Sequence, residues 1–341
     1  MRVDFRSDTV TIPTAEMLEA MFTAEVGDDV FEEDPTINAL EQKAAKMFGM
    51  EAGLFCPSGT QTNQIAINVH TRPGDEVICD VLSHIHVYEG GGIAANSGVS
   101  TTLIDGEKGQ ITAEQIKAVV KADNVHFPKS TLVSLENTCN KAGGTVYDLK
   151  KIQEIKTWCA SHNIALHLDG ARIFNATVAA DYSTKDIGNC FDTISMCLSK
   201  GLGAPVGSVL LGNKEFINQA RRVRKRFGGG MRQAGYLAAA GIYALDNNVE
   251  RLKTDHMNAI ELGKTFQDLS FVTKVTPVET NIVMVHFDAP NTTEKVMELL
   301  TKNDIHALTL TPTSIRLVTH LDVSAEQFDF AMDFISKMNI L

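Results

Sequence analysis

The chain has 341 residues, of which 42 are Asp or Glu and 31 are Lys or Arg, so its formal net charge is −11 with neutral histidine. This negative charge argues against nucleic acid or an anionic membrane surface as the main partner, and no apolar run reaches the length of a membrane span. The six cysteines are scattered without a Cys-x-x-Cys pair, which excludes a disulfide framework and a zinc site of that type.

The first residues, 1–14, are predicted to form a polar arm that ends near a proline. The charged start of this arm lacks the apolar stretch of a signal peptide, and with the cysteine pattern it predicts a cytoplasmic protein. Thr14 is the expected N-cap of a helix over Ala15–Phe22. Thr36–Met47, with apolar residues at helical spacing, is predicted to be an amphipathic helix.

Strands and helices then alternate, which favours an α/β fold with a mostly parallel, doubly wound sheet covered by helices. The predicted strands are Leu54–Cys56, Glu76–Asp80, Thr101–Ile104, Ser130–Leu135, Ala165–Leu168, Ile194–Leu198 and Val206–Leu211. The predicted helices are Gln64–His70, Thr112–Lys121, Leu149–His162, Phe216–Arg226 and Arg232–Leu245.

In the last hundred residues the regular alternation of strands and helices ends, which predicts a smaller α+β lobe. We expect three parts: the arm 1–14, a large domain 15–246 and a small domain 247–341. Within the small domain the predicted helices are Glu250–Leu269, Thr292–Lys302 and Ala325–Met338. Its predicted strands are Val272–Val275, Asn281–Phe287 and Ile315–Thr319.

Lys200 follows a short apolar strand and precedes the glycine-interrupted turn Gly201-Leu202-Gly203. A lysine placed there lies beside open space, and partial burial can lower its pKa and make it a Schiff-base nucleophile. The alternative is an ordinary exposed lysine in a loop.

Asp169 and Arg172 follow another predicted strand, at the sheet edge where open α/β sheets bind ligands. The carboxylate can face a protonated ring nitrogen, and the arginine can reach a phenolate oxygen or a substrate carboxylate. The alternative is a structural Asp-Gly turn with a surface ion pair.

Ser58-Gly59-Thr60 lies between a strand and a helix, where backbone N–H groups and a hydroxyl form an anion site suited to phosphate. It is neither a Walker A motif nor part of a strand–Gly-x-Gly-x-x-Gly–helix unit, so a nucleotide is disfavoured. A plain helix cap is the alternative.

His84 follows a strand and has a second histidine two residues on, but no third metal ligand has convincing spacing. We therefore predict no metal. The imidazole of His84 is suited to stacking on a planar cofactor or to acting as a base. His126 is a second such candidate, and for both the alternative is a structural histidine.

Three further basic residues point to anions. Lys225 and Arg232 flank the run Gly228-Gly229-Gly230, whose backbone can approach an anion closely, although a solvated helix face and a flexible loop are the alternative. Arg316 lies in an apolar strand and needs an anionic partner such as a substrate carboxylate. Together, these candidates match pyridoxal 5′-phosphate, an electron sink carried on a lysine with an Asp partner on its ring nitrogen.

The chain resembles the L-threonine aldolases, fold-type I pyridoxal-phosphate lyases, over nearly its whole length. The matching segments are RSDTVTIPT, EVGDDVFEEDPT, PSGTQTNQ, HFPKSTLVSLENTCN, HLDGARIFNA, CLSKGLGAPVGSVLLG, GGGMRQAG and IRLVTHLDV. The resemblance implies cleavage of L-threonine, L-allo-threonine and related β-hydroxy amino acids to glycine and an aldehyde. The open alternatives are β-elimination or transamination on the same cofactor, and a protein of this fold that binds amino acids without turnover.

The resemblance also assigns roles. It implies that Lys200 carries the cofactor, Asp169 pairs with its ring nitrogen, and His84 stacks on the ring. By the same resemblance, Gly59 and Thr60 hold the phosphate, His126 lies near the substrate hydroxyl, and the substrate carboxylate is bound by Arg172, Arg316 and Ser7. Lys225 and Arg232 would reach the phosphate of a neighbouring subunit, which implies a homotetramer with shared sites. Departures from the usual family residues at Phe31, Glu32 and Cys139 bear on substrate breadth and threo/erythro preference.

Overall fold

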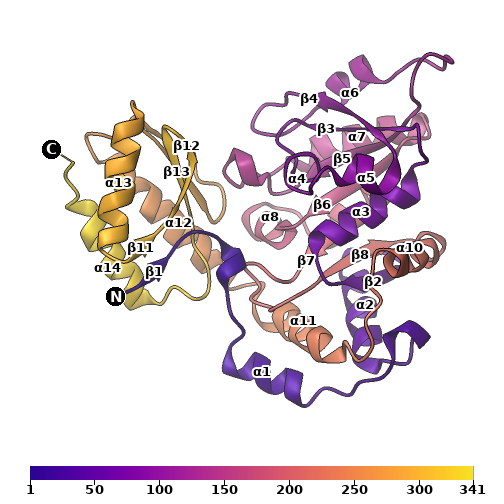
Figure 1. Ribbon diagram of the computed structural model, residues 1–341, viewed down its shortest axis with the longest axis horizontal. Coiled ribbons are helices and arrows are strands. Elements are labelled where there is room, and N and C mark those ends of the chain that lie inside the picture. Colours follow the sequence, from indigo (N-terminus) through magenta and orange to yellow (C-terminus); the bar gives the residue numbers. More distant parts are fainter. Residues whose placement is uncertain (341) are drawn as a thin grey trace.

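Strands between residues 52 and 212 form the central sheet of the computed structural model, which describes residues 1–340 (Figure 1). Within these residues, the sheet has seven strands in the order β2-β8-β7-β6-β5-β3-β4, and only β8 runs antiparallel to its neighbours. This confirms the predicted α/β class. The strands are β2 Ala52–Cys56, β3 Glu76–Asp80, β4 Ser100–Ile104, β5 Ser130–Glu136, β6 Ala165–Gly170, β7 Thr193–Cys197 and β8 Ser208–Gly212.

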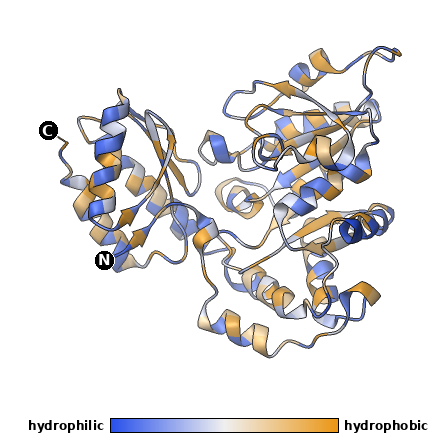
Figure 2. Ribbon diagram, viewed as in Figure 1, coloured by the Kyte–Doolittle hydropathy of each residue, from blue (hydrophilic) through white to orange (hydrophobic). Residues whose placement is uncertain are grey.

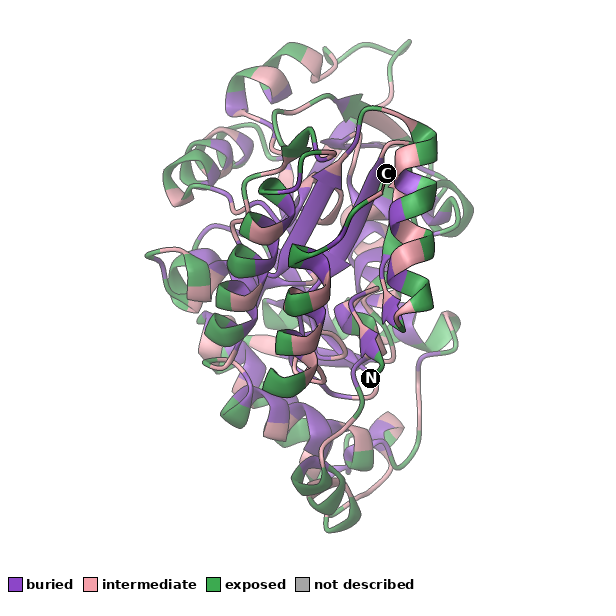
Figure 3. Ribbon diagram, turned by 90° about the vertical axis from the view of Figure 1, so that its left-hand side faces the viewer, coloured by how far each residue is buried: buried purple, intermediate pink, exposed green. Residues whose placement is uncertain are grey.

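Successive strand residues are buried on opposite faces of this sheet. Leu54 packs with α3 and α10 on one face, whereas Phe55 packs in the larger cluster on the other. The helices that cover the two faces turn hydrophobic residues inward and hydrophilic ones outward (Figures 2 and 3). The helices of this part of the chain are α1 Ala15–Phe22, α2 Pro35–Phe48, α3 Gly59–His70, α4 His84–Val87, α5 Gly92–Ser97, α6 Ala113–Val119, α7 Leu149–Ser161, α8 Ile173–Ala179, α9 Thr184–Gly188, α10 Lys214–Arg226 and α11 Gly235–Asn247.

Capping explains where the helices begin. Thr14 accepts a hydrogen bond from the backbone N–H of Met17 and caps α1, as predicted. Helix α3 begins at Gly59, five residues before the predicted Gln64, because Ser58 accepts from the N–H of Gln61 and makes the polar segment helical. The apolar spacing used for the prediction carried no information on that polar turn. No helix among residues 1–340 has the length and apolarity required to cross a bilayer.

The smaller lobe is built around a four-stranded antiparallel sheet of order β12-β13-β10-β9 within the described residues. Its strands are β9 Lys274–Val275, β10 Ile282–His286, β12 Leu308–Thr311 and β13 Ser314–Val318. The helices around it are α12 Leu252–Gln267, α13 Pro290–Lys302 and α14 Ala325–Ser336.

The first residues differ from the predicted polar arm. Strand β1, Val3–Asp4, pairs in parallel with β11, Ile305–His306, so that both chain ends lie in the small lobe (Figure 1). Val3 and Phe5 are 1% and 0% exposed and belong to the hydrophobic core of that lobe. Alternation of Val3 and Phe5 with the charged Asp4 is a strand pattern that the overall polarity of the segment obscured.

We expect Phe5→Ala to lower the free energy of unfolding by about 3–5 kcal/mol, because it opens a cavity in the core of the small lobe. The matched control is Ile12→Ala, since Ile12 is 67% exposed and its truncation should change stability by less than about 0.5 kcal/mol. Urea unfolding of both variants measures the difference. Equal stability of the two variants would show that residues 3–5 are not part of the folded core.

Candidate active site

A cavity of about 350 Å³ lies at the carboxyl ends of β6 and β7. It is lined by Thr9, Ser58, Gly59, Thr60, Asn63, His84, Asp169, Ala171, Cys197, Ser199, Lys200 and Pro205. The structure therefore brings together six of the predicted residues, namely Ser58, Gly59, Thr60, His84, Asp169 and Lys200. They come from segments far apart in the sequence but adjacent at this sheet edge.

Lys200 is half-buried just after β7, and its backbone carbonyl accepts a hydrogen bond of 3.0 Å from the Thr11 hydroxyl. Its Nζ donates to Cys197 Sγ over 3.2 Å. Burial by itself would lower the pKa of this amine, but Cys197, and further Asp8 and Asp169, raise it above the ordinary value. These groups thus oppose the predicted lowering of the pKa of Lys200, and the amine must lose a proton before it can attack a carbonyl.

The amino terminus of α3 faces the cavity. A Cβ on Gly59 would lie 2.6 Å from Cys197 Sγ, so glycine lets the helix start approach β7 closely. Ser58 caps the N–H of Gln61 over 3.2 Å. The other N–H groups of the first turn have no acceptor within the helix, and they provide a site for an anion at the cavity wall.

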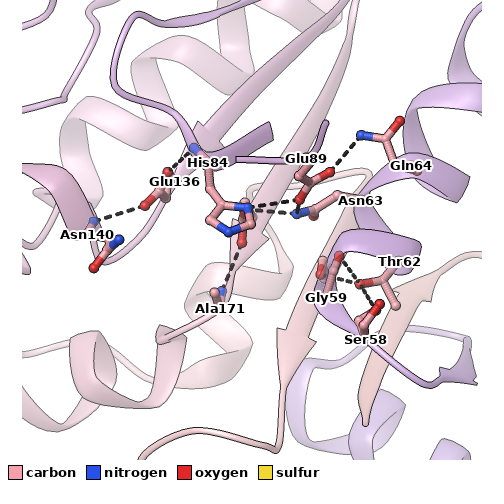
Figure 4. A network of polar contacts seen from close by, with 12 residues as sticks. Ser58, Gly59, Thr62, Asn63, Gln64, His84, Glu89, Glu136, Asn140 and Ala171 are labelled. Carbon is pink, nitrogen blue, oxygen red and sulfur yellow. Dashed lines mark hydrogen bonds and ion pairs between the residues drawn. The ribbon is translucent and has the colours of Figure 1, made fainter. Parts of the chain in front are cut away.

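His84, Glu89 and Asn63 form a polar network at the cavity (Figure 4), and Asn63 joins it to Asp169. His84 Nδ1 lies 3.0 Å from Glu89 Oε1. The side-chain amide of Asn63 donates to Glu89 Oε1 and to Asp169 Oδ2, each over 2.9 Å. Burial opposes the charged form of His84, but the hydrogen bond to Glu89 and the charge of Asp169 outweigh it and raise the pKa of His84 above 6.5.

His84, Glu89 and Asp169 also offer atoms within 4.8 Å of one another, close enough for a metal ion. Two of these three groups already accept from the amide of Asn63. Because an N–H donor points into the same place, the arrangement is better suited to holding two carboxylates beside an imidazole than to holding a cation.

Glu136, at the end of β5, is an active-site neighbour that the sequence analysis missed. Its carboxylate accepts from the backbone N–H of His84 over 2.7 Å and from that of Asn140 over 2.9 Å. Burial, with the charge of Asp169, raises the pKa of Glu136 to about 7. A glutamate that ends an apolar strand next to the strand of Asp169 is the signal that could have identified it.

The two arginines predicted to bind a carboxylate differ in their partners. Arg172 is buried, and its Nε and Nη2 donate to both oxygens of Asp8 over 2.7 and 2.6 Å. Arg316 donates to Asn140 Oδ1 over 2.9 Å and to the Arg6 carbonyl over 3.2 Å, whereas its buried Nε has no partner. Within residues 1–340, Arg316 has no carboxylate at ion-pair distance, so of the two it is the cation left to receive an anion.

Ser7 and His126 lie outside the cavity lining, as do Arg172 and Arg316. Ser7 uses its hydroxyl to accept from the N–H and the hydroxyl of Thr9, which itself lines the cavity. His126 is exposed in the loop before β5. Because the cavity lies at the carboxyl ends of the strands, that loop is at the opposite edge of the sheet. The structure does not bring His126 to the site of its own chain, which corrects the expectation for a single subunit.

Lys225 and Arg232 also lie outside this cavity. Lys225, at the end of α10, lines a separate hollow of about 530 Å³ beside Asp29 and Gly230. Arg232 donates to Asp28 over 2.9 Å. The glycine loop between them is joined to α3, because Gln61 donates to the Phe227 carbonyl over 3.2 Å.

The three departures from the usual family residues are also outside the cavity lining. Phe31 is 69% exposed. Glu32 has a φ of +62°, a left-handed conformation that glycine adopts more readily. Cys139 is buried, with its thiol against the carbonyls of Gly109 and Glu136 over 3.2 and 3.0 Å.

Comparisons with known proteins identify a family and relatives of similar sequence. A family described as "Beta-eliminating lyase" matches residues 4–290. The chain is 44% identical to a low-specificity L-threonine aldolase of Escherichia coli (strain K12) over 326 residues, which cover 95% of this chain and 96% of that one. It is 40% identical to low-specificity L-threonine aldolase 1 of Arabidopsis thaliana over 337 residues, 97% of this chain and 94% of that one.

Solved structures extend the comparison to the fold. The threonine aldolase of Leishmania major superimposes with a TM-score of 0.87 at 21% identity, covering 98% of this chain and 99% of that one. Serine palmitoyltransferase of Sphingomonas wittichii gives a TM-score of 0.76 at 15% identity, over 98% and 86% of the two chains. Both share the architecture of the large sheet and the small lobe.

We expect Asp8→Asn to lower the free energy of unfolding at pH 7 by on the order of 3 kcal/mol, because it leaves Arg172 buried without its ion-pair partner. Burial would raise the pKa of Asp8, but Arg172 lowers it from 3.8 to about 2. The stabilisation by ionised Asp8 is therefore complete above about pH 4 and is lost as the pH falls towards 2.

Urea unfolding at pH 7 and pH 3 measures this effect. The gap between wild type and Asp8→Asn should narrow by on the order of 1 kcal/mol at the lower pH. Glu250→Gln is the control, since its ion pair with Lys253 is exposed and should contribute less than about 1 kcal/mol. A gap that does not depend on pH would contradict the assignment.

Proposed function

From the premise that the chain belongs to the beta-eliminating lyase family, together with the low-specificity L-threonine aldolases, we propose that it is a pyridoxal-phosphate-dependent aldehyde-lyase. Its proposed substrates are L-threonine, L-allo-threonine and related L-β-hydroxy-α-amino acids, which it cleaves to glycine and the matching aldehyde. One observation carries the proposal: a single cavity contains an amine, a carboxylate, an imidazole and a helix amino terminus, from Lys200, Asp169, His84 and α3.

The residues present fit pyridoxal phosphate. Gly59 lets the start of α3 pack closely against Cys197 at the cavity, and the N–H groups of the first turn would hold the phosphate. Asp169 accepts two N–H groups, from Asn63 and Ala171, which keep it an acceptor for a protonated ring nitrogen. Lys200 would hold the cofactor through its amine. When bound, the cofactor supplies an electron sink for the bond broken at the substrate Cα.

The substrate carboxylate is assigned to Arg316. Burial, and then the neighbouring charge of Arg172, lower the pKa of Arg316, which supports its assignment as a cation that needs an anionic partner. Arg172 acts differently from the expectation: bound by Asp8, it orients the Asn140 amide, whose oxygen lies 3.4 Å from Arg172 Nη1 and 2.9 Å from Arg316 Nη1. Because both arginines contact the Asn140 oxygen, they hold each other in place and provide a fixed binding surface for a planar anion.

The proton of the substrate β-hydroxyl is assigned to His84. Its Nδ1 is engaged by Glu89, so Nε2 is the nitrogen left to take the proton directly or through a water. His126 is not available for this step within one chain, since it is exposed at the other edge of the sheet. General-base help of this kind contributes about 10²–10⁴-fold to a rate.

A coupled assay tests the reaction. With pyridoxal phosphate and either threonine epimer, the protein should release acetaldehyde, seen as NADH oxidation by alcohol dehydrogenase, together with glycine. Lys200→Ala should lose the visible absorbance of the bound cofactor and nearly all turnover while keeping its urea midpoint. Pyruvate or another keto acid would identify elimination or transamination instead. An absorbance shift without product would identify a binding protein, and in each case the aldolase proposal fails.

We also propose that the protein is a cytoplasmic homotetramer in which neighbouring subunits share their sites. All six cysteines are buried and unpaired, which supports a reducing compartment. Exposed apolar side chains support a subunit interface: Phe22 is 82% exposed and Phe31 is 69% exposed. Lys225 and Arg232, which lie outside the cavity of their own chain, would act in that of the neighbour.

Subunit complementation tests the shared site. Lys200→Ala and Arg232→Ala homo-oligomers should each be nearly inactive. Co-expression should restore activity if the two residues serve one site from different chains, because some mixed sites then carry both native residues. A mixture as inactive as its components, or a monomer by light scattering, would contradict the proposal. Lys264→Ala, on α12 away from the cavity, is the control in place of Arg232→Ala.

A further inference from the structure

A continuous line of buried polar side chains runs between α3 and the central sheet, from the active site to the amino-terminal edge of the strands. Asn63 and His70 lie two turns apart on α3, and His167 and Thr193 are direct register partners on β6 and β7. His167 Nε2 lies 3.1 Å from Asn63 Oδ1, and His167 Nδ1 lies 2.9 Å from Thr193 Oγ1. His70 Nε2 lies 2.9 Å from the same hydroxyl.

The direction of every hydrogen bond in this line is fixed by its end at the active site. The Asn63 amide faces two carboxylates, of Glu89 and Asp169, so its NH₂ group must point to them and its oxygen to His167. His167 Nε2 must then carry a hydrogen.

The remaining members follow from the charge of His167. Burial, with the nearby His70, lowers the pKa of His167 to about 3, so the ring is neutral and its Nδ1 is an acceptor. Thr193 therefore donates its hydroxyl hydrogen to His167. The Thr193 oxygen in turn accepts from Nε2–H of His70, whose pKa burial lowers to about 4. The whole line donates in one direction, towards the two carboxylates.

Burying this line of polar side chains costs free energy of folding that apolar side chains at the same positions would not. Asn63 is 1% exposed, and His167 and Thr193 are 0% exposed. Buried polar groups destabilise a fold unless each finds its partner, and replacement of a satisfied set by apolar side chains is often neutral for stability. Here each member is satisfied by the next, and the last one contacts the acids around the reacting cavity.

We propose that Asn63 and His167 are positioning residues: His167 holds the Asn63 amide, and this amide fixes both the Asp169 carboxylate and the Glu89 carboxylate that binds His84. The inference rests on the proposed function, in which Asp169 faces a ring nitrogen and His84 moves a proton. A neutral amide is suited to this task, because it donates to two carboxylates without neutralising either. One residue thus contacts both the acid of the site and the carboxylate that holds its base.

The experiment compares two substitutions of His167 in the full-length enzyme. His167→Met removes the N–H donor to Asn63, whereas His167→Gln keeps a donor at the place of Nε2. For His167→Met we expect kcat to fall and the dissociation constant of pyridoxal phosphate for the cofactor-free enzyme to rise, each by about tenfold, with a nearly unchanged KM. His167→Gln should return both values most of the way to wild type.

Ser195→Ala is the matched control. Ser195 is buried on the same strand as Thr193, is the register partner of Asp169, and its hydroxyl lies 2.6 Å from that of Thr62, outside the line. Its removal costs one buried hydrogen bond of the same layer and should leave kcat and cofactor affinity as in wild type. Equal losses in Ser195→Ala and His167→Met, or a His167→Met enzyme with wild-type values, would overturn the proposal.

Histidine ¹H–¹⁵N spectra of the cofactor-free protein test the line independently of the reaction. His167 and His70 should be neutral Nε2–H tautomers throughout pH 5.5–8.5, with assignment from His167→Gln and His70→Gln. An Nδ1–H tautomer, or titration of His167 within this range, would overturn the proposed direction. If wild type released no aldehyde but the spectra were as expected, the proposed function alone would fail.

Discussion

The buried ion pair between Asp8 and Arg172 joins the three parts of the chain that meet at the cavity. Arg172 follows the strand that carries Asp169, Asp8 belongs to the first residues, and Asn281 of the small lobe donates to Asp8 over 3.3 Å. All three are buried, so neither charge can be left without the other. The pair also determines the chemistry beside it: because Arg172 is already neutralised, Arg316 is the arginine that still needs an anion.

The carboxylates near the cavity also differ in the groups that contact them. Asp169 receives two N–H donors and stays an acceptor, Glu89 is held against His84, and Glu136 has a pKa raised to about 7 by burial and by Asp169. Three acids within one small region therefore differ in their surroundings, and the pKa of Glu136 is raised by burial and by Asp169 although two backbone N–H groups donate to it. In Figure 4, Glu89 contacts the ring of His84 and Glu136 accepts from its backbone N–H, so two different carboxylates hold this residue.

Much of this arrangement could be predicted from the sequence. Apolar runs gave the strands of the large sheet, and the polar residues just after them, such as Lys200 and Asp169, were predicted to lie at one edge because parallel strands end together. Contacts between distant residues could not be predicted in this way. Asp8 lies 164 positions from Arg172 in the sequence. No local pattern shows that Arg172 binds the Asp8 carboxylate instead of the predicted substrate carboxylate.

Local sequence patterns also cannot distinguish a residue at the active site from one elsewhere when both have similar flanking residues. The family resemblance predicts that His126 lies near the substrate hydroxyl, yet the loop that carries it precedes its strand instead of following it. Asn63 is not among the predicted site residues, although its amide connects two carboxylates. In both cases the role of the residue depends on its neighbours in the folded structure, and the spacing of residues along the chain does not reveal them.

The pairing of β1 with β11 has a consequence for how the chain is made. The small lobe takes Val3 and Phe5 from residues that are synthesised before the large sheet, and the rest of its core from residues 259–338. The intervening large sheet can therefore form during translation, while the emerged amino-terminal strand has no partner. The small lobe closes only after the last helices have been synthesised, and with it the contact of Arg316 to Asn140. Ribosome-bound nascent chains would thus carry a folded large sheet that still lacks the contact between Arg316 and Asn140.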